Sequence, residues 1–445
     1  MAIQNFKKIR KFLETYVPKF MEKHKIPGFS VALIKNDEIV YSEGFGARDL
    51  EKNLPATPNT LYGIGSCTKS FVAMSIMQLV ERNKIKLNDS IDQYVPFRIR
   101  LSRNPITIHH LLTHSSGIPS LATSTVVLYR SIGEETGIPW GGINDFYRFI
   151  NDAGDEIVDE PGNRFFYFNA GYRILGHIIQ IISDLTIDAY ISENILIPLN
   201  MKQTTFSKNQ YEKAVDRMTP YWKKPDKTLE PTKFPYPDIA DNPDFSFNAA
   251  AGGLISSAIE LTNYLKANIN QGKYGNIQLL SVDSAKKMQK LHIERPQQHF
   301  GKYGYGYGWN VTEDFFGHKM ISHGGSILVS TAYLAFIPQL KIGIAMLSNS
   351  SGFPFQTVAQ GIFVALMDRS PEKAVPALRI QKRREILTGT YEIYKGLGRL
   401  EIVNREGLLY LEQNTPFTER SVPLIPETGI PEHGKYYIVS EGIKQ

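Results

Sequence analysis

Residues 62–71, with the sequence YGIGSCTKSF, place Ser66 three positions before Lys69 at the start of an apolar run with helical periodicity. Residues three apart lie on the same face of a helix, so Lys69 is expected one turn above Ser66. The positive end of the helix dipole and the free backbone N–H groups of the first turn would favour negative charge on the serine oxygen. An ordinary N-cap serine followed by a surface lysine has the same spacing, so this stretch leaves both interpretations open.

A second polar stretch lies at residues 161–183, PGNRFFYFNAGYRILGHIIQIIS. Tyr167 lies in a loop at the start of a predicted helix, from which a tyrosine hydroxyl can relay a proton. Asn169 follows two residues later and can point to the same side. The helix is expected to bury its apolar side chains, which are Ile174, Leu175, Ile178 and Ile181.

A third stretch, residues 319–336 with the sequence KMISHGGSILVSTAYLAF, has His323, Gly324 and Gly325 leading into a predicted strand. The two glycines would let a substrate backbone approach an edge strand closely. The histidine adds a cation or a hydrogen-bond donor. We therefore expect part of the substrate-binding site at this strand.

Taken in chain order, three motifs resemble the active-site motifs of the serine β-lactamase and penicillin-binding-protein superfamily. They are Ser-x-x-Lys beginning at Ser66, Tyr-x-Asn beginning at Tyr167 and His-x-Gly beginning at His323. Residues 106–119, ITIHHLLTHSSGIP, are similar to the Leu-Leu-Thr-His-x-Ser-Gly segment of the class C, CubicO-type branch. The resemblance covers about residues 5–370, and the motifs are closest to those of D-aminopeptidase-like serine peptidases.

The resemblance implies a serine hydrolase that works through an acyl-enzyme. Ser66 would attack the acyl carbon, and Lys69 and Tyr167 would share the proton transfers of acylation and deacylation. The backbone N–H groups of Ser66 and Ser326 would form the oxyanion hole. Asn169 would orient the substrate.

The third motif departs from the commonest pattern of the superfamily. β-Lactamases and carboxypeptidases usually have a lysine that meets the substrate carboxylate, whereas this chain has His323, as D-aminopeptidase-like members do. The resemblance therefore implies a catalytic role for His323 and substrate binding by Gly324 and Gly325. Phe168 replaces the commoner small residue inside the Tyr-x-Asn motif, which should make the local wall bulkier.

Strand-like sequence lies early and late in the main part of the chain, with mostly helical sequence between. Residues 27–46 form two β-rich runs around a turn at 35–38, and residues 331–350 form two more around Pro338. We expect an antiparallel sheet whose first and last strands are neighbours, flanked by helices and accompanied by an all-α lobe. This α+β architecture is the serine β-lactamase/transpeptidase-like fold that the resemblance implies.

The end of the chain has a different pattern. Residues 371–383 are charged and contain two prolines, which predicts a linker between a catalytic domain at residues 1–370 and a small C-terminal β-module at residues 384–445. The module resembles the lipocalin-like β-barrel appended to some family members, although it is short for a full barrel. Its few strands would expose their edges, which favours a homo-oligomer.

Composition argues against several other functions. The chain has 50 Lys and Arg against 44 Asp and Glu, and it contains no recognisable nucleic-acid-binding motif. No apolar run reaches the length of a membrane span. The N-terminus predicts an amphipathic helix rather than a signal peptide, so we expect a cytoplasmic location. Cys67 is the single cysteine, which excludes an intrachain disulfide and fits a reducing compartment.

We expect neither a metal nor another cofactor. His110 and His114 are four residues apart, but the glutamate of a His-Glu-x-x-His zinc motif is missing. A structural role in the turn of residues 106–119 is expected for these histidines instead. The sequence therefore predicts a metal-free acyl-serine hydrolase.

The substrate class stays open at this stage. We expect a small molecule or a short peptide, with a peptide or D-amino-acid amide first, a carboxylic ester second and a β-lactam third. The alternative from a different class is a penicillin-recognising or scaffold protein that acylates slowly or not at all. The pocket walls should come from loops at about residues 118–145 and 207–247, whose folding the sequence alone does not predict.

Overall fold

The computed structural model describes residues 2–99, 104–131, 133–235, 243–296, 299–396, 398–415, 418–427, 435–440 and 443–444. Contacts within the chain divide it into two compact units. The larger unit comprises residues 16–355, and the smaller comprises residues 1–15 together with residues 356–445. All the residues of the three motifs lie in the larger unit.

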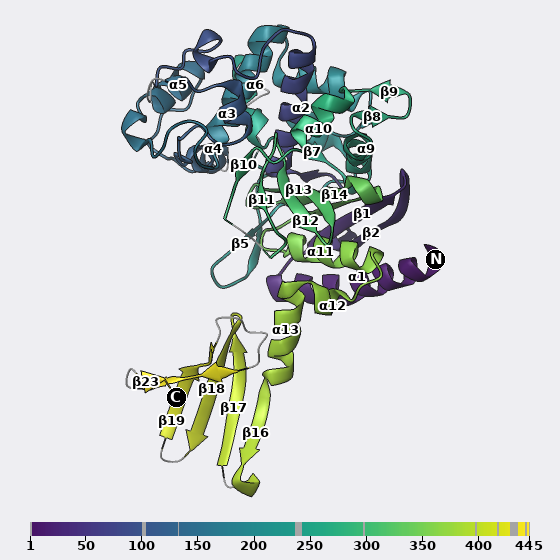
Figure 1. Cartoon of the computed structure of the whole chain (residues 1–445), viewed down its shortest axis with the longest axis vertical. Coiled ribbons are helices and arrows are strands. Elements are labelled where there is room, and N and C mark those ends of the chain that lie inside the picture. Colours follow the sequence, from purple (N-terminus) through teal and green to yellow (C-terminus); the bar gives the residue numbers. More distant parts are fainter. Residues whose placement is uncertain are drawn as a thin grey trace. The chain divides into compact units, whose positions relative to one another are not determined.

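The larger unit is built on an antiparallel sheet of nine strands in the order β10-β11-β12-β13-β14-β15-β1-β2-β3 (Figure 1). Strand β1, the first of these strands in the chain, pairs with both β2 and β15, and β15 is the last of them in the chain. Phe29 of β1 lies opposite Ser348 of β15. This confirms that the first and last strands are neighbours. The strands are β1 (Gly28–Lys35), β2 (Glu38–Asp49), β3 (Leu54–Pro55), β10 (Ile293–Glu294), β11 (Tyr303–Tyr305), β12 (Asn310–Phe315), β13 (His318–Ser326), β14 (Thr331–Ile337) and β15 (Ile342–Ser348).

Two tight turns set the register at the centre of this sheet. The β1–β2 hairpin closes through Asn36 and Asp37, which both have positive φ, at 50° and 67°. Such a turn matches the right-handed twist of the paired strands, and Asn and Asp tolerate the left-handed conformation best among residues with a side chain. The β14–β15 hairpin closes through Pro338–Leu340 and Lys341. Both hairpins were predicted, and both are confirmed.

Helices fill the sequence between β4 (Tyr62–Gly63) and β10. Most of them form a helical lobe beside the sheet (Figure 1), and the predicted α+β architecture with an all-α lobe is confirmed. These helices are α2 (Thr68–Glu81), α3 (Ile108–Leu112), α4 (Thr123–Ser131), α5 (Ile143–Asn151), α6 (Asn169–Ser183), α7 (Ile187–Ile191), α8 (Lys208–Lys213), α9 (Ala258–Ile269) and α10 (Val282–Met288). Short pairs of strands join them, namely β4 with β7 (Ile255–Ser256), β5 (Tyr221–Lys223) with β6 (Leu229–Pro231), and β8 (Lys273–Tyr274) with β9 (Ile277–Gln278).

Helix α2, which begins two residues after Ser66, is a core helix. It is buried on all sides over most of its length, a pattern typical of helices at the centre of a large protein. The ring of Phe71 on α2 stacks on Tyr264 of α9, with 3.7 Å between the ring centroids. Packing along the length of α2 therefore fixes the position of its first turn, next to Ser66.

Helix α6 supplies a second core element. Ile174, Leu175 and Ile178 are fully buried, as predicted. The prediction for Ile181 is wrong, because 46% of this side chain is exposed in the last turn of the helix.

Among the described residues no single helix is long and apolar enough to cross a membrane; α6 and residues 187–196 satisfy length and composition only as a pair bent by 79°.

The smaller unit contains the start of α1 (Ala2–His24), most of α11 (Phe355–Leu366), the helices α12 (Pro371–Ala374) and α13 (Pro376–Leu387), and an antiparallel sheet. Residues 371–383, for which the sequence predicts a linker, are thus largely helical. The sheet has the order β16-β17-β18-β19, and a turn at Glu406 and Gly407, both with positive φ, joins β17 to β18. Its strands are β16 (Gly389–Ile393), β17 (Gly398–Arg405), β18 (Leu408–Thr415) and β19 (Thr418–Pro423).

The four-stranded sheet of the smaller unit is open, because β16 and β19 do not pair with each other. Two short strand pairs follow it. They are β20 (Ile425–Pro426) with β21 (Tyr436–Tyr437), and β22 (Val439–Ser440) with β23 (Ile443–Lys444). Leu409 of β18 is buried, whereas Leu408 is 57% exposed, so this sheet has little core of its own among the described residues.

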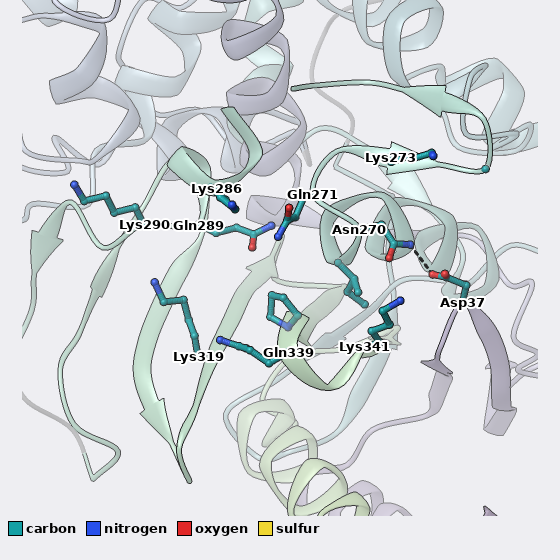
Figure 2. A pocket seen from close by; sticks show the side chains of 13 residues that line it. Asp37, Asn270, Gln271, Lys273, Lys286, Gln289, Lys290, Lys319, Gln339 and Lys341 are labelled. Atoms are coloured by element: carbon teal, nitrogen blue, oxygen red, sulfur yellow. Dashed lines mark hydrogen bonds between the residues drawn. The ribbon is translucent and has the colours of Figure 1, made fainter. Parts of the chain in front are cut away.

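A wide cavity opens on the larger unit between α9, α10 and the β14–β15 turn (Figure 2). Asp37 is the single acidic residue along its described wall, and its carboxylate already accepts a hydrogen bond of 2.6 Å from Asn270. None of the residues predicted for catalysis or substrate binding lines this cavity. Basic side chains dominate the lining, namely Lys273, Lys286, Lys290, Lys319 and Lys341.

Candidate active site

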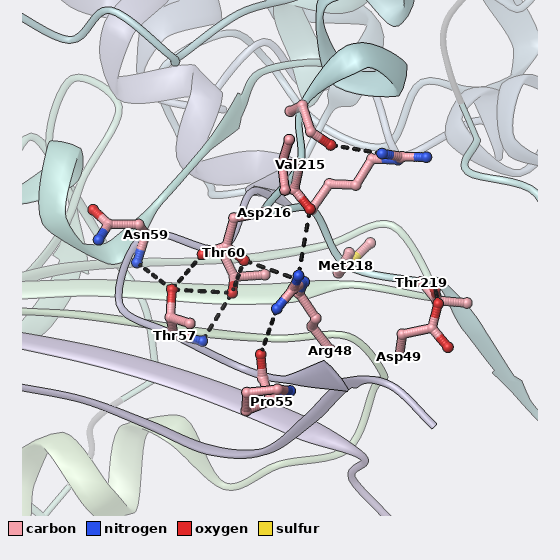
Figure 3. Close-up of polar contacts among 12 residues, drawn as sticks. Arg48, Asp49, Pro55, Thr57, Asn59, Thr60, Val215, Asp216, Met218 and Thr219 are labelled. Carbon is pink, nitrogen blue, oxygen red and sulfur yellow. Dashed lines mark hydrogen bonds and ion pairs between the residues drawn. The ribbon is translucent and has the colours of Figure 1, made fainter. Parts of the chain in front are cut away.

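A polar cluster around Asp216 holds the segment that leads to Ser66 (Figure 3). The Asp216 carboxylate accepts hydrogen bonds from the hydroxyls of Thr57 at 2.5 Å and Thr60 at 2.6 Å. It also pairs with Arg48, whose Nε lies 3.4 Å away. Leu61 N donates to Asp216 O at 2.9 Å, so the chain is fixed in place just before β4 and the serine.

Ser66 lies in a short 3-10 turn (Gly65–Cys67) that runs directly into α2. Gly65 has φ +51°, and a Cβ atom at this position would lie 2.5 Å from Ser326 N, so only glycine fits there. Thr68 Oγ1 donates to Gly65 O at 2.7 Å and accepts from Leu254 N at 3.2 Å, which braces the turn. Ser66 itself is half-buried and lines a cavity.

Lys69 is fully buried, so the interpretation of this lysine as a surface residue is wrong. Its Nζ lies 3.1 Å from Ser66 Oγ, 2.8 Å from Asn169 Oδ1 and 2.5 Å from Ala251 O. Burial, and secondly the nearby guanidinium of Arg173, hold the pKa of Lys69 well below its ordinary value. These effects favour the neutral amine.

The neutral amine fits its three neighbours. It has two N–H donors and one lone pair, and the oxygens of Asn169 and Ala251 can only accept. When both donors are used there, the lone pair is left for the Ser66 hydroxyl, which can donate. The geometry is therefore suited to removal of the Ser66 proton by Lys69.

Tyr167 lies just before α6 and close to both of these residues. Lys69 Nζ lies 5.0 Å from the centroid of its ring. Burial raises the pKa of Tyr167, and a side-chain hydrogen bond with Ser66 opposes this shift more weakly. Tyr167 is thus held as the neutral phenol, which can donate a proton.

The N–H groups of Ser66 and Ser326 lie on two chain segments that come very close together. A Cβ atom at Gly325 would lie 2.7 Å from Ser66 N and 1.9 Å from Ile64 O, so a glycine is required on the β13 side as well. Ser66 and Ser326 line the same cavity. This proximity is what a two-donor oxyanion hole requires.

His323 is buried, and both nitrogens of its ring have protein partners. Nδ1 lies 2.7 Å from Gly324 O, which can only accept, so Nδ1 carries the hydrogen. Nε2 lies 2.8 Å from the Tyr305 hydroxyl and accepts from it. Burial, together with Lys69 and Arg295, lowers the pKa of His323 to about 3, so the ring is neutral. It has no hydrogen bond to Ser66, Lys69 or Tyr167 among the described residues, and its catalytic role stays a prediction.

An aromatic layer supports the loop that contains Tyr167. The ring of His114 packs between Tyr167 and Tyr305, with centroid distances of 4.3 Å and 4.9 Å. His114 Nδ1 accepts a hydrogen bond of 3.1 Å from Phe168 N. This contact gives residues 106–119 a structural role at the site.

The cavity beside Ser66 has a volume of about 120 Å³ and is partly open to solvent. Both loops predicted for the walls contribute, with Val127 and Leu128 from one and Pro235 from the other. The expectation of a bulkier wall at Phe168 is wrong, because this side chain is buried and packs beneath Gly171. The sequence also missed Arg173, which lines the cavity from α6.

Two other reactive groups near the site have structural environments. Cys67 is buried, its Sγ donates to His323 O at 3.3 Å, and burial raises the pKa of its thiol to about 12. His110 Nδ1 accepts from Thr107 N and so caps α3. Within the part of the chain that the structure describes, no group of three or more His, Cys, Asp or Glu is arranged to hold a metal ion.

A buried lysine bonded to a serine at a helix start, with a tyrosine beside both, is the site arrangement of the β-lactamase and penicillin-binding-protein class of proteins. The comparison with known families agrees: a model described as Beta-lactamase matches residues 13–367, and the chain belongs to this family. A second model, described as the Pab87 octamerisation domain, matches residues 371–445.

Among solved structures, the octameric penicillin-binding protein homologue from Pyrococcus abyssi is 36% identical to this chain. The match covers 97% of this chain and 94% of that chain, with a TM-score of 0.84. A class C β-lactamase shares the fold at 22% identity and a TM-score of 0.64, over 81% of this chain and 96% of that chain.

Protein flp of Staphylococcus aureus strain MW2 is 28% identical over 348 residues, which are 76% of this chain and 62% of flp. The chain therefore spans about three fifths of the length of this curated relative. These matches support a class C-like member of the superfamily, whereas the D-aminopeptidase-like branch and the lipocalin-like form of the C-terminal module stay predictions.

Proposed function

We propose that this protein is a hydrolase that forms an acyl-enzyme on Ser66. The observation that carries the proposal is the position of Lys69 Nζ, 3.1 Å from Ser66 Oγ and within hydrogen-bond distance of two oxygens that can only accept. A nucleophilic serine needs a base of this kind, because its hydroxyl is a weak nucleophile while protonated. Membership of the β-lactamase family is consistent with this chemistry.

In the proposed acylation step, the Lys69 amine takes the Ser66 proton as Oγ bonds to the acyl carbon. The carbonyl oxygen becomes an oxyanion, which the N–H groups of Ser66 and Ser326 stabilise by about 3 kcal/mol for each donor. As the bond to the leaving group breaks, the neutral Tyr167 hydroxyl supplies that group with a proton, and the Lys69 ammonium restores the proton of Tyr167. A water molecule then attacks the acyl carbon and gives its proton to the Lys69 amine. The ester bond to Ser66 Oγ breaks, Oγ takes that proton back from the Lys69 ammonium, and the carboxylic acid product leaves.

For the substrate, we propose a short peptide or a D-amino-acid amide, with a carboxylic ester as the second candidate. The support is the neutral state of His323, because this ring offers no cation at the position where β-lactamases and carboxypeptidases have a lysine. A neutral group at that place favours substrates without a carboxylate beside the leaving group.

Turnover of three chromogenic substrates tests the proposal. They are a D-alanyl nitroanilide, a nitrophenyl ester and a cephalosporin. We expect the anilide to be hydrolysed with the highest kcat/KM relative to its spontaneous rate, and Ser66→Ala to abolish turnover. A stable acyl adduct on intact protein, with no turnover of any of the three, would support the non-hydrolysing alternative instead.

We also propose that the protein is a homo-oligomer assembled through residues 371–445. The match of these residues to an octamerisation domain supports this, as does the likeness of the whole chain to an octameric relative. The small core of the four-stranded sheet and its open edges are consistent with burial against other subunits.

A further inference from the structure

Arg173 is a buried cation in the wall of the cavity beside Ser66. It lies on α6 one turn beyond Asn169, and only 3% of the residue is exposed. Its Nε donates to Asn248 O at 3.2 Å, and its guanidinium lies 5.7 Å from the ring centroid of Trp140. Its Nη1 is buried and, within the described part of the chain, has no hydrogen-bond partner.

The charge of Arg173 also lacks a protein counter-ion there. No acidic side chain is among the described residues that line the cavity, and none forms an ion pair with Arg173. Asn248 lines the same cavity and is 5% exposed, and its Oδ1 has no hydrogen-bond partner among the described residues. Buried charges in proteins are normally paired, because an isolated buried ion loses several kcal/mol of hydration. A guanidinium that has no counter-ion within the described part of the chain, at the wall of a cavity, is therefore suited to an anionic ligand.

The position of the cavity indicates which part of a substrate would reach Arg173. Ser66, Asn169, Arg173 and Ser326 line it, whereas Tyr167 does not. Tyr167 is the group proposed to protonate the leaving group, so the leaving group departs on the Tyr167 side. The cavity that contains Arg173 is then left for the acyl part of the substrate.

We propose that this cavity selects acyl groups that end in a carboxylate, which binds to the guanidinium of Arg173. The substrate class would be amides or esters of dicarboxylic acids, including acidic amino acids joined through one of their two carboxyl groups. Asn169 contacts Lys69 beside Ser66, and Arg173 lies four residues farther along α6, ~6 Å along the axis, so we choose an acyl chain about as long as adipoyl for the test. This inference rests on the proposed acyl-enzyme at Ser66.

A matched pair of substrates tests the proposal with the full-length protein. One is the mono-4-nitrophenyl ester of adipic acid, and the other is the same ester with a terminal carboxamide in place of the free carboxylate. The leaving groups are identical, so the ratio of the two kcat/KM values reports the contribution of the carboxylate alone. We expect the carboxylate ester to be preferred about 10- to 100-fold, the range of a charge-assisted hydrogen bond.

Two variants test whether Arg173 causes the preference. Arg173→Gln should bring the ratio close to 1, even if its overall rate falls because the pKa of Lys69 changes. Asn248→Asp should also remove the preference, because it places a carboxylate in the cavity beside an unchanged guanidinium. Arg82→Gln, which alters an exposed arginine at the end of α2, is the matched control and should leave the ratio unchanged.

The possible outcomes distinguish a failure of this inference from a failure of the proposed function. Turnover of both esters with a ratio near 1 in the wild type would overturn the inference and leave the Ser66 hydrolase intact. A preference that persists in both Arg173→Gln and Asn248→Asp would also overturn it. No turnover of either ester, together with no labelling of Ser66 by an acylating probe, would overturn the proposed function itself.

Discussion

Lys69 Nζ lies 3.1 Å from Ser66 Oγ, and the amine is fully buried without a carboxylate among its hydrogen-bond partners. A lysine in this position is less stable as an ammonium than it would be in water. The burial that favours the neutral amine, the form we propose as the base, therefore costs the protein stability.

Ser66 should be the residue that becomes acylated. We expect a fluorophosphonate probe to modify one peptide, the one that contains Ser66, because its hydroxyl is next to a base and two N–H donors. Mass spectrometry of the digested protein measures this. Ser42→Ala, an exposed serine on β2, is the control and should label like the wild type. Labelling that persists in Ser66→Ala would disprove the assignment.

Lys69→Met should lower turnover by at least about 100-fold, the scale expected for a positioned base. It should also raise the free energy of unfolding at neutral pH by about 0.5–2 kcal/mol, because it removes a buried amine in favour of an apolar side chain of similar length. Thermal unfolding and turnover of the same sample measure the two effects. A destabilised variant would show that Lys69 is mainly a structural hydrogen-bond donor.

The acidic limb of the pH–rate profile should report the titration of Lys69. If the neutral amine is the base, as we propose, kcat/KM should fall as the pH drops below the lowered pKa of Lys69. Arg173→Gln should move this limb to higher pH, because Arg173 is a cause of the lowered pKa. An unchanged limb in that variant would mean that burial alone sets the pKa.

The lowered pKa of Lys69 also determines how its contribution to folding stability changes with pH. Between the lowered pKa and the ordinary value of 10.5, the unfolded chain binds more protons at Lys69 than the folded chain. The contribution of Lys69 to folding stability therefore rises with pH across this window. The gain in stability of Lys69→Met over the wild type should accordingly shrink as the pH approaches 10.5.

Asp216→Asn should destabilise the larger unit by about 1–3 kcal/mol, because the hydroxyls of Thr57 and Thr60 and the charge of Arg48 all depend on this carboxylate. Chemical denaturation measures the change. Glu294→Gln is a suitable control, because the ion pair of Glu294 with Lys302 is exposed to solvent and should contribute little to stability. Equal effects of the two substitutions would contradict an anchoring role for Asp216.

Removal of residues 388–445 should reduce the number of subunits in each particle, while Ser66 still reacts with the probe. The strands that would be lost belong to the region matched by the octamerisation domain, and every motif residue lies outside it. Light scattering and probe labelling of the same folded sample measure this. An unchanged number of subunits in each particle would show that assembly does not depend on these strands.

Local patterns in the sequence were sufficient to predict much of the fold. Periodicity predicted the burial of Ile174 and Ile178 on α6, because residues about one turn apart share a face. Turn chemistry predicted the hairpins at Asn36 and Pro338, because the conformations these turns need depend on a few adjacent residues. The order of strand-like and helical sequence predicted that the first and last strands of the sheet are neighbours, and the pairing of β1 with β15 confirms it.

The environment of each charge depended on the tertiary structure. Spacing brought Ser66 and Lys69 to one helix face, but the burial of Lys69 depends on Ala251, a carbonyl 182 residues away in the chain. Arg173 directly precedes the apolar pair Ile174 and Leu175 on α6, and the sequence did not indicate whether solvent, a carboxylate or a cavity would face it. Its environment depends on Asn248, 75 residues later, whose carbonyl oxygen accepts from its Nε, while Nη1 has no partner among the residues that the structure describes. Hydration and pairing of a charge are properties of everything packed around it, so they were decided only when distant segments came together.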